Sequence, residues 1–400
     1  MLKPLREVAD VYYGQSPVDV LDDEGDVPVV GTGGTYAAAN KALFDPPAVV
    51  VPRKGSLGNP QLFEVPCWPV DTTYAVIPKS GVDAAWLYYN LFRYDLTRLN
   101  EATGVPSISR DWLVRINFED PGPEAQRKIG SILRAVDLTL CASTSLIRKY
   151  QNIQTGLMHN LFSRGLDAGY RVRPTRQHAP ELYKQSSVGW IPRHWVIDTT
   201  DSLLADIIDY RGKTPQKSSD GIPLITARNI RMGYVDPEPR EYISESTYRS
   251  WMTRGIPSYG DVLITMEAPL GNVAQVETPD RVAFAQRVII LQPNNRIRND
   301  FLKFLLMTDS VQRSIVRRAS GTTALGIKQS EFRKVVVAYP DDAEEQKAIV
   351  SILRATEGYL RALKRSVRKR HQQKSGVAAD LLTGLVPVNV DQACGKSAYV

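Results

Sequence analysis

The segment QRKIGSILRA at Gln126–Ala135 recurs as QKAIVSILRA at Gln346–Ala355, so the pentapeptide Ser-Ile-Leu-Arg-Ala occurs twice, 220 residues apart. At the same separation, Leu140 corresponds to Leu360. A similarity that persists at one separation indicates an internal duplication rather than a chance match. We therefore expect two copies of one structural design, and a function that makes use of both.

Each copy of this segment is predicted to begin a long helix. The first helix follows Pro123, and the second follows Asp342 with Glu345 three residues later, which resembles a capping box. Gly165 and Gly384 are expected to end the two helices. Apolar residues alternate at steps of three and four, which is typical of a coiled-coil seam. The expected seam residues are Leu133, Val136, Leu140, Ile147, Tyr150, Leu157 and Leu161 in the first helix and Leu353, Leu360, Leu363, Val367, Val377 and Leu381 in the second.

The two helices are expected to be about 40 residues and about 60 Å long and to pair with each other. Polar residues such as Ser143, Gln154 and Lys374 interrupt the seams, which disfavours two separate long dimers. An antiparallel pair is favoured because a whole globular domain has to fit between the end of the first helix and the start of the second.

The block before each helix is also duplicated. Val49–Asn59 (VVVPRKGSLGN) corresponds to Val262–Asn272 (VLITMEAPLGN) at a separation of 213, and Tyr13–Pro17 corresponds to Arg211–Pro215 at 198. Short apolar runs between Gly, Pro and Asn predict strands, and Ala84–Arg93 predicts a helix. The expected fold class is therefore α+β, with two such domains joined by two long antiparallel coiled-coil helices in an internal pseudo-twofold repeat.

Composition is compatible with this division and adds a charge signal. The 400 residues are 43% apolar, and Lys and Arg exceed Asp and Glu by 50 to 43. Eight basic residues lie between Arg354 and Lys374 against one acid, Glu357. This cluster is either a solvated helix face or a surface that meets phosphates or a partner. Three scattered cysteines predict neither a disulfide framework nor a metal site, and the lack of a signal peptide or a membrane-spanning apolar run predicts a cytoplasmic protein that does not bind membranes.

Two motifs superficially resemble catalytic loops. Asp45–Ala48 (DPPA) is similar to the loop of amino-methyltransferases, but the aromatic residue that stacks on a flipped base is absent, so a turn is the better interpretation. Pro340–Lys347 contains the acids and lysine of some nucleases, but helix capping explains them better. No phosphate-binding P-loop occurs. Each histidine is isolated and is interpreted as a surface or packing residue: His159, His178, His194 and His371.

Several phrases resemble the DNA-specificity subunit of type I restriction-modification systems. In the second half they are Arg211–Pro215 (RGKTP), Gly221–Ile230 (GIPLITARNI), Gly260–Ile264 (GDVLI), Leu270–Ala274 (LGNVA) and Ser320–Thr323 (SGTT). In the first half, Gly31–Gly34 (GTGG), Arg53–Gly58 (RKGSLG) and Thr103–Pro106 (TGVP) resemble a second type of recognition domain from the same family. Ala268-Pro269 departs from the usual Gly-containing step, and Glu124-Ala125-Gln126 from the usual paired Glu-Gln.

This resemblance implies a non-catalytic protein that reads double-stranded DNA. Each domain would bind one half of a split, asymmetric site, and the helices would act as spacers and as docking surfaces for two methyltransferase subunits. Those partners would bring S-adenosylmethionine, and helicase-nuclease restriction subunits would join to cut DNA; the chain itself would hold no cofactor and no metal. The implied division is target recognition domain 1 at 1–122, spacer helix 1 at 123–165, a linker at 166–188, target recognition domain 2 at 189–340, spacer helix 2 at 341–385 and a C-terminal tail at 386–400.

Two other functions stay open at this point. One is a coiled-coil scaffold, which would leave the two mixed domains without a role. The other is the sequence-reading part of a self-contained adenine methyltransferase-nuclease, for which catalytic domains would have to be added to a chain already filled by two copies.

Polar residues in glycine-rich turns are the candidates for contacting DNA, because base edges and phosphates are bound by Arg, Lys, Asn, Gln, Ser, Thr and turn amides. Gly58-Asn59 and Gly271-Asn272 occur in both copies, so they equally well build the common fold. The candidates are Thr32, Gly33, Arg53, Lys54, Ser56 and Asn59 in the first domain and Arg211, Lys213, Thr214, Arg228, Asn229, Arg231, Glu267 and Asn272 in the second.

Overall fold

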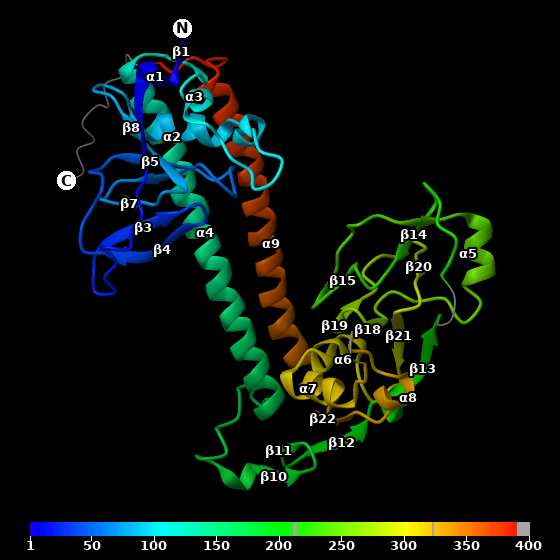
Figure 1. Cartoon of the computed structure of the whole chain (residues 1–400). Coiled ribbons are helices and arrows are strands. Elements are labelled where there is room, and N and C mark those ends of the chain that lie inside the picture. Colours follow the sequence, from blue (N-terminus) through cyan, green and yellow to red (C-terminus); the bar gives the residue numbers. More distant parts are fainter. Residues whose placement is uncertain (211–213, 322–323, 390–400) are drawn as a thin grey trace. The chain divides into compact units, whose positions relative to one another are not determined.

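A computed structural model describes residues 1–210, 214–321 and 324–389 (Figure 1). The chain divides into two compact units, one made of Met1–Leu146 with the chain from Leu363 onward, and one made of Ile147–Ala362. Both long helices are shared between the units, so each unit contains a mixed domain and about half of each helix. We describe each unit by itself.

The first unit contains strands and short helices followed by the start of the first long helix. In chain order its elements are β1 (Leu2–Pro4), α1 (Leu5–Val8), β2 (Ala9–Tyr13), β3 (Val27–Gly31), β4 (Gly34–Ala39), β5 (Ala48–Pro52), β6 (Gln61–Phe63), β7 (Trp68–Pro69), β8 (Thr73–Pro78), α2 (Ala84–Arg93), η1 (Leu96–Leu99), α3 (Arg110–Leu113), β9 (Asn117–Glu119) and α4 (Pro123–Arg164).

The second unit has the end of α4 and the start of α9 on either side of its mixed domain. In chain order its further elements are η2 (Pro180–Leu182), β10 (Tyr183–Ser186), β11 (Gly189–Pro192), β12 (Trp195–Thr199), η3 (Asp201–Leu203), β13 (Leu204–Asp209), β14 (Ile222–Ile225), β15 (Ile230–Arg231), β16 (Tyr234–Val235), β17 (Tyr242–Ile243), α5 (Glu245–Trp251), β18 (Val262–Met266), β19 (Leu270–Gln275), β20 (Ala283–Phe284), β21 (Val288–Pro293), α6 (Asn299–Leu306), α7 (Asp309–Arg318), α8 (Gln329–Phe332), β22 (Val336–Pro340) and α9 (Ala343–Leu382).

The sheets of the two units share one topology. The first unit has a four-stranded sheet in the order β2-β8-β5-β6 and a three-stranded sheet β4-β3-β7, and the second has β13-β21-β18-β19 and β17-β14-β20. In both three-stranded sheets one pair is parallel, β3 with β7 and β14 with β20. The predicted duplication of the α+β blocks is thereby confirmed strand by strand.

Strand register corrects one of the predicted correspondences. Val49 pairs with Val76 where Val262 pairs with Leu291, which agrees with the predicted separation of 213 on β5 and β18. On β2, however, Tyr13 pairs with Tyr74, and the equivalent pair is Asp209 with Ile289. Tyr13 therefore corresponds to Asp209 and not to Arg211, because a sequence match in the following loop does not have to keep the register of the strand. Residues 211–213 lie outside the described residues.

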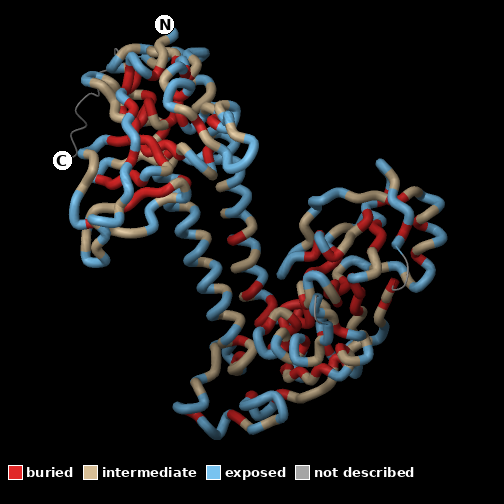
Figure 2. The backbone as a smooth tube through the Cα atoms, viewed as in Figure 1, coloured by how far each residue is buried: buried red, intermediate tan, exposed pale blue. Residues whose placement is uncertain are grey.

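Apolar side chains form a separate core in each unit (Figure 2). In the first, Trp86 of α2 packs with Val49 and Val76 of the sheet and with Leu133 of α4. In the second, Phe301 of α6 lies in a core that also contains sheet and α9 residues. The start of each long helix is thus buried as part of a domain core. The segment predicted as a linker at 166–188 contains β10, which pairs with β11 as a hairpin.

The long helices have the predicted extent and pair antiparallel. Helix α4 has 42 residues and α9 has 40, and Gly165 and Gly384 lie beyond their ends with φ of 64° and 72°. Within the first unit, Asp137 of α4 contacts Lys374 at 2.5 Å, and Ser143 contacts Arg370 at 3.5 Å. From one contact to the next the residue number rises along α4 and falls along α9, so the two helices run antiparallel. Within the second unit, the rings of Tyr150 and Tyr359 lie 4.4 Å apart.

The capping box expected at α9 forms only in part. The Asp342 carboxylate accepts a hydrogen bond from the Glu344 amide at 2.9 Å. The Glu345 carboxylate does not complete the box, because it instead accepts hydrogen bonds from Leu166, Arg173 and Trp195. The expected seam residues differ in burial. Leu133, Leu140, Leu161, Leu353 and Leu360 are buried, Val377 is 40% exposed, and Val136, Ile147, Tyr150, Leu157, Leu363, Val367 and Leu381 are half-buried.

Within the described residues, one helix, α4, is long and apolar enough to cross a membrane by length and composition alone, with a mean hydropathy of 1.2. This differs from the expectation of no such run. The same helix buries Leu133 in the domain core, and its Asp137 accepts a hydrogen bond from the Tyr89 hydroxyl at 2.7 Å. These contacts place part of the apolar stretch in the domain core, although only 22% of it is buried within the chain.

Candidate nucleic-acid interface

Two of the predicted DNA-contacting segments of the first unit lie side by side. Thr32 and Gly33 form the turn between β3 and β4, and Gly55 lies in the loop that follows β5. A Cβ placed on Gly55 would lie 4.0 Å from the Thr32 hydroxyl oxygen. Gln61 at the start of β6 donates a hydrogen bond to the Gly31 carbonyl at 3.5 Å and joins the two segments. Two glycine-rich turns therefore present their polar groups at one edge of the domain.

Arg53 and Lys54 are held at this edge by their backbone. The Arg53 amide donates to the Thr72 carbonyl at 2.9 Å, and the Lys54 backbone is bridged to Ser107. The Arg53 guanidinium lies over the Tyr13 ring, 5.3 Å from its centroid, while its buried Nε has no hydrogen-bond partner among the described residues. The buried Nε does not face solvent, but a guanidinium held in place by stacking on a ring is suited to binding acceptors on DNA.

The other candidates of the first unit are more open to solvent. Gly33, Lys54, Ser56 and Asn59 are exposed, and Thr32 is half-buried. Gly55 has a φ of 84°, which a residue with a Cβ rarely adopts, so the turn that carries Lys54 and Ser56 requires a glycine there. The exposed positions leave these polar groups free to meet a base edge or a phosphate.

The second unit repeats the backbone of this edge but changes its charge. Register places Glu267 where the first unit has Lys54, and each forms a bridge to an equivalent loop, Lys54 with Ser107 and Glu267 with Gly326. Ala268 has a φ of 42° where Gly55 has 84°, so both turns keep a left-handed residue. A lysine binds acceptors, whereas a glutamate accepts from the amino group of cytosine. The same scaffold therefore offers different chemistry in its two copies.

Two predicted reading residues of the second unit are engaged within the fold. Asn229 is 1% exposed, its Oδ1 accepts from the backbone and side chain of Thr226, and its Nδ2 donates to the Asp236 and Pro239 carbonyls. Its amide is fully used, so it shapes the turn and offers nothing to a base. Asn272 similarly donates from Nδ2 to the Ile230 carbonyl at 2.8 Å.

The remaining candidates of the second unit lie at several places. Arg228 is exposed in the turn before β15, and Arg231 at the end of β15 is 48% exposed and lies 3.5 Å from Asp236. Thr214 is exposed, and Glu267 is half-buried. Arg211 and Lys213 lie outside the described residues. Among the described candidates of this domain the cations are thus Arg228, just before β15, and Arg231, at its end.

Sequence reasoning missed three residues at these edges. Tyr13 is 51% exposed and supports Arg53, Tyr36 on β4 is 63% exposed, and Gln61 joins the two turns. An exposed aromatic next to a turn can stack on a base or a sugar. The signal available in the sequence was the aromatic residue directly before Gly14 in the Tyr13–Pro17 motif.

Buried titratable groups near the edge are unsuited to chemistry at neutral pH. Burial raises the pKa of the Tyr74 phenol to about 12, and its hydroxyl donates to the Ile108 carbonyl at 3.0 Å. Burial likewise raises the pKa of the Cys67 thiol to about 11, which disfavours a nucleophilic thiolate. The described ranges contain no group of three or more His, Cys, Asp and Glu placed to hold a metal ion.

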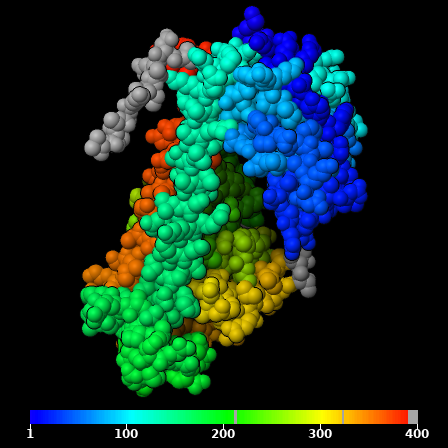
Figure 3. Space-filling model, turned by 90° about the vertical axis from the view of Figure 1, so that its left-hand side faces the viewer, coloured from blue at the N-terminus to red at the C-terminus, as the bar shows by residue number. Residues whose placement is uncertain are grey.

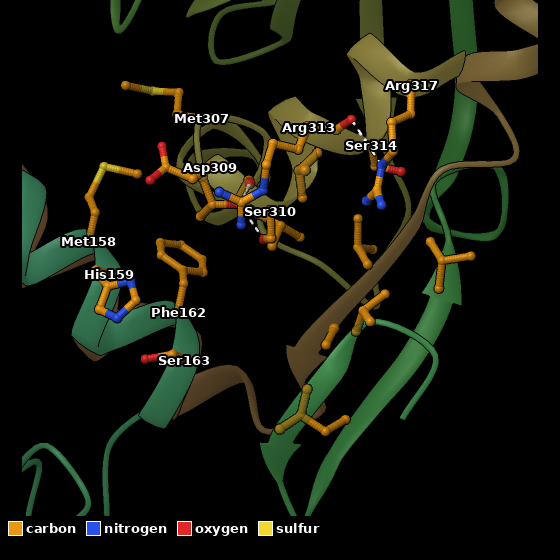
Figure 4. A pocket seen from close by; sticks show the side chains of 18 of the residues that line it. Met158, His159, Phe162, Ser163, Met307, Asp309, Ser310, Arg313, Ser314 and Arg317 are labelled. Carbon is orange, nitrogen blue, oxygen red and sulfur yellow. Dashed lines mark hydrogen bonds between the residues drawn. The ribbon is translucent and has the colours of Figure 1, made fainter. Parts of the chain in front are cut away.

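The second unit also has a groove of about 870 Å³ between the end of α4 and α7 (Figure 4). Met158 and Phe162 of α4 face Met307, while Arg313 and Arg317 of α7 lie along the other side. In the first unit the equivalent of α7 is the four-residue η1. The helix that forms one wall of this groove is thus longer in the second copy than its equivalent in the first.

Comparisons with known proteins agree with this architecture. A family model for the type I restriction modification DNA specificity domain matches residues 1–149 and 202–367. The putative type I restriction enzyme MjaX specificity subunit of Methanocaldococcus jannaschii is 23% identical over 324 residues, which cover 78% of this chain and 70% of that protein.

Two solved structures share the fold. The type I restriction-modification S subunit from M. genitalium has a TM-score of 0.64 and 15% identity, with 96% of each chain covered. A chain from a structure on complex assembly and conformational transition of the type I R-M system has a TM-score of 0.53 and 14% identity, covering 96% of this chain and 98% of that one. Because the family model matches both halves and most of the length of the chain, the protein belongs to the family of type I restriction-modification DNA specificity proteins.

Proposed function

We propose that each α+β domain binds one half of a bipartite, asymmetric DNA site, within a type I restriction-modification complex. The observation that carries this proposal is the pair Lys54 and Glu267, which occupy one position of one scaffold with opposite charges. Two readers with different chemistry select two different half-sites, so the whole target has no twofold symmetry. The reading groups that we retain are Arg53, Lys54 and Ser56 in the first domain and Arg228, Arg231 and Glu267 in the second.

The chain is proposed to be non-catalytic, with methyl transfer carried out by a partner that binds S-adenosylmethionine. The Asp45–Ala48 segment supports this view. It leads directly into the buried strand β5, and Phe44 just before it is bridged to the buried Cys67. Asp45, Pro46 and Pro47 are exposed, and the segment lacks the aromatic residue that would stack on a flipped base.

The long helices are proposed to dock two methyltransferase subunits, with helicase-nuclease subunits joining the complex in the cytoplasm. In the first unit, Leu138 of α4 is 72% exposed and Leu146 is 36% exposed. The surface of α4 is open to solvent along the face seen in Figure 3. Apolar residues on an exposed helix face are typical of a surface that a partner covers. One of the structural relatives comes from a study of complex assembly in the type I R-M system, which is consistent with this role.

The experiment for this function combines the chain with its methyltransferase partner. The purified chain alone is expected to transfer no methyl group to DNA, and the combination is expected to methylate adenine at one bipartite sequence. Methylation by the chain freed of its partner would end the non-catalytic proposal. Methylation without sequence preference in the combined sample would end the proposal that the domains read DNA.

A second experiment tests the helices as a spacer. One heptad added to α4 after Ser143, matched by one heptad added to α9 before Arg370, keeps the contact between these residues and lengthens both helices by about 10 Å, or roughly three base pairs. Both half-sites should persist while the unread gap grows by about one to three base pairs. An active complex with the original gap contradicts the spacer, and methylation mapped in cells distinguishes these results.

A further inference from the structure

The cationic cluster of α9 divides into residues that are paired within the chain and residues that are not. Arg354 lies 3.4 Å from Asp300, Arg361 binds Glu277 at 2.8 Å, and Lys374 binds Asp137 at 2.5 Å. Arg370 donates to the Ser143 hydroxyl. These four residues therefore have a structural role, and the charge signal noted in the sequence is carried by the other four.

Those other four, Lys364, Arg365, Arg368 and Lys369, are all exposed in the first unit. Among the described residues their side chains form no hydrogen bond or ion pair. At about 100° per residue they lie within about 140° of the helix surface. Leu363 and Val367, which are half-buried, lie on the opposite side. The four cations thus form one surface, which we call the basic face of α9, and which turns away from the seam.

The basic face is unfavourable for the isolated helix. Lys364 with Arg368 and Arg365 with Lys369 are like charges four residues apart, which destabilise a helix. No acid occurs between Gly358 and Ala379 to offset them. In the first copy the residues equivalent to Lys364 and Arg365 are Thr144 and Ser145, whereas those equivalent to Arg368 and Lys369 are Arg148 and Lys149, and α4 is helical there. The charges of Lys364 and Arg365 are therefore particular to the second copy and are not needed to form the helix.

We propose that the basic face of α9 binds the phosphate backbone of double-stranded DNA without reading its sequence. This rests on the proposed function, because it adds a grip outside the two half-sites. The four residues span about 7.5 Å along the helix, and each DNA strand presents a phosphate every 3.4 Å or so of its axis. The face can therefore meet two or more phosphates. Lysine and arginine side chains are the groups that neutralise them.

A DNA backbone fits this face better than a protein partner does. The exposed surface continues toward the C-terminus through Gln372 and Gly376, and no heavy atom lies within 4 Å of a Cβ placed on Gly376. The centre of a protein interface is usually apolar and poor in lysine, whereas a surface of cations and small polar groups is typical of sequence-independent DNA contact.

The test replaces all four residues, Lys364→Gln, Arg365→Gln, Arg368→Gln and Lys369→Gln, in the complex with the methyltransferase partner. Glutamine is a good helix former, so α9 is expected to stay intact. The slope of log K against log salt on cognate DNA should fall by about two to four, because each lost phosphate contact lowers it by about 0.9. Methylation mapping should show unchanged half-sites. The control removes the same charge from other exposed positions of the first unit, by Arg6→Gln, Lys41→Gln, Arg93→Gln and Arg98→Gln, and should leave the slope closer to that of the parent.

Other results would overturn the proposal. An unchanged salt slope in the variant, or an equal fall of the slope in the control, would show that the basic face does not bind phosphates. Loss of the complex in the absence of DNA, measured by sedimentation, assigns the basic face to protein docking instead. If the parent complex itself binds DNA without sequence preference, the proposed function fails, and the salt slope of the variant still decides whether the face binds phosphates. The double variant Arg368→Gln with Lys369→Gln should give about half the fall.

Discussion

The two recognition domains hold their long helices by a corresponding glutamine but differ in several of the contacts around it. Gln126 Oε1 accepts from the Asp83 amide at 3.0 Å, and Gln346 Oε1 accepts from the Arg298 amide at 3.0 Å. Both side chains are nearly fully buried in the first turn of α4 and of α9. The repeated sequence therefore preserves a joint between helix and domain, which any recognition domain of this design needs.

The neighbouring residue shows how far the copies have diverged. Next to Gln126 stands Ala125, whereas next to Gln346 stands Glu345. Glu345 accepts from the Leu166 amide at 2.8 Å, from Arg173 at 2.7 Å and from the Trp195 indole at 3.2 Å. It ties the chain after α4 to the start of α9 in the second unit. In the first copy alanine makes no such tie.

Further along the two long helices, one pair of corresponding positions carries an acid in both copies, but the two acids have different partners. Asp137 of α4 accepts from the Tyr89 hydroxyl at 2.7 Å, and the corresponding Glu357 of α9 accepts from the buried Lys303 at 2.9 Å. The domain supplies a tyrosine hydroxyl in one copy and a buried lysine in the other, while Asp137 also contacts Lys374 and Glu357 also contacts Arg361. The frame tolerates this exchange because an acid at this position needs a donor, and either kind of donor supplies it.

The largest expected effect comes from breaking the Glu345 tie. Glu345→Ala should lower the free energy of unfolding of the second unit by about 3–5 kcal/mol, because Arg173, which is 12% exposed, is left as an unpaired buried charge. Urea denaturation measures this loss. The control Glu124→Ala removes an exposed acid from the first turn of α4 and should cost less than about 0.5 kcal/mol. Equal losses of free energy of unfolding in the two variants would show that the hydrogen bonds of Glu345 do not stabilise the second unit.

The same carboxylate gives the tie a pH dependence. Burial alone would raise the pKa of Glu345, but hydrogen bonds from Arg173, Leu166 and His194 outweigh it and hold the pKa below its usual 4.5. The stabilisation is therefore complete above pH 4.5 and is lost as pH falls through the lower, folded-state pKa. Glu345→Ala should remove that part of the acid sensitivity below pH 4.5 and leave the pH dependence of stability near neutrality unchanged.

The second prediction compares the charged and the neutral partner of the helix acid. Lys303→Met should cost about 1.5–3 kcal/mol, because Glu357 loses its hydrogen bonds from a buried charge but keeps Arg361 as a partner, whereas Tyr89→Phe should cost about 1.5 kcal/mol through one lost hydrogen bond to Asp137. The double variant Lys303→Met with Glu357→Leu should recover much of the loss. If the double variant is less stable than Lys303→Met alone, then Glu357 stabilises the fold through contacts other than its ion pair with Lys303.

The third prediction tests whether the shared joint works equally in both copies. Gln126→Ala and Gln346→Ala each leave a partly buried backbone amide without its acceptor, so each should cost about 1–2 kcal/mol. Thermal unfolding of the two variants should therefore shift by similar amounts. A loss confined to one variant would mean that the joint has become dispensable in the other copy.

Local sequence explains why so much of the fold could be predicted. Repeated residues, seam periodicity and the glycines at 165 and 384 are all local or copied signals, so the duplication and the helix ends followed from them. The antiparallel pairing followed from the length of chain that has to fit between the two helices. The tie at Glu345 could not be predicted, because Arg173 is 172 residues away along the chain and reaches it only in the folded state.

The candidate reading residues were harder to judge for the same reason. Asn229 and Arg228 are neighbours in the same turn, and the sequence alone predicts both of them as DNA-contacting residues. Only the fold brings the Asp236 and Pro239 carbonyls to Asn229 and buries its amide while Arg228 stays exposed. Whether a polar turn residue is buried or stays exposed depends on which backbone carbonyls the rest of the turn leaves without a hydrogen-bond donor.

The smallest effects on stability are expected at the reading edges, where the two copies should differ most in function. Arg228→Ala, at an exposed site, should change the free energy of unfolding by less than about 0.5 kcal/mol, and Asn229→Ala, which removes buried hydrogen bonds, should cost about 1–3 kcal/mol. In DNA binding the order should reverse. Arg228→Ala should weaken the second half-site by about 1–3 kcal/mol if it reads a base, or reduce the salt slope by about one if it binds a phosphate.

The first domain provides the matched comparison for that last experiment. Arg53→Ala removes the guanidinium stacked on Tyr13 and should weaken only the first half-site, leaving the second at parent affinity. Lys54→Glu gives the first domain the charge that Glu267 has in the second, and should change which base is preferred at one position. Competition binding with each base pair varied separates these outcomes. If Arg53→Ala or Arg228→Ala alters both half-sites equally, the two domains do not read DNA independently.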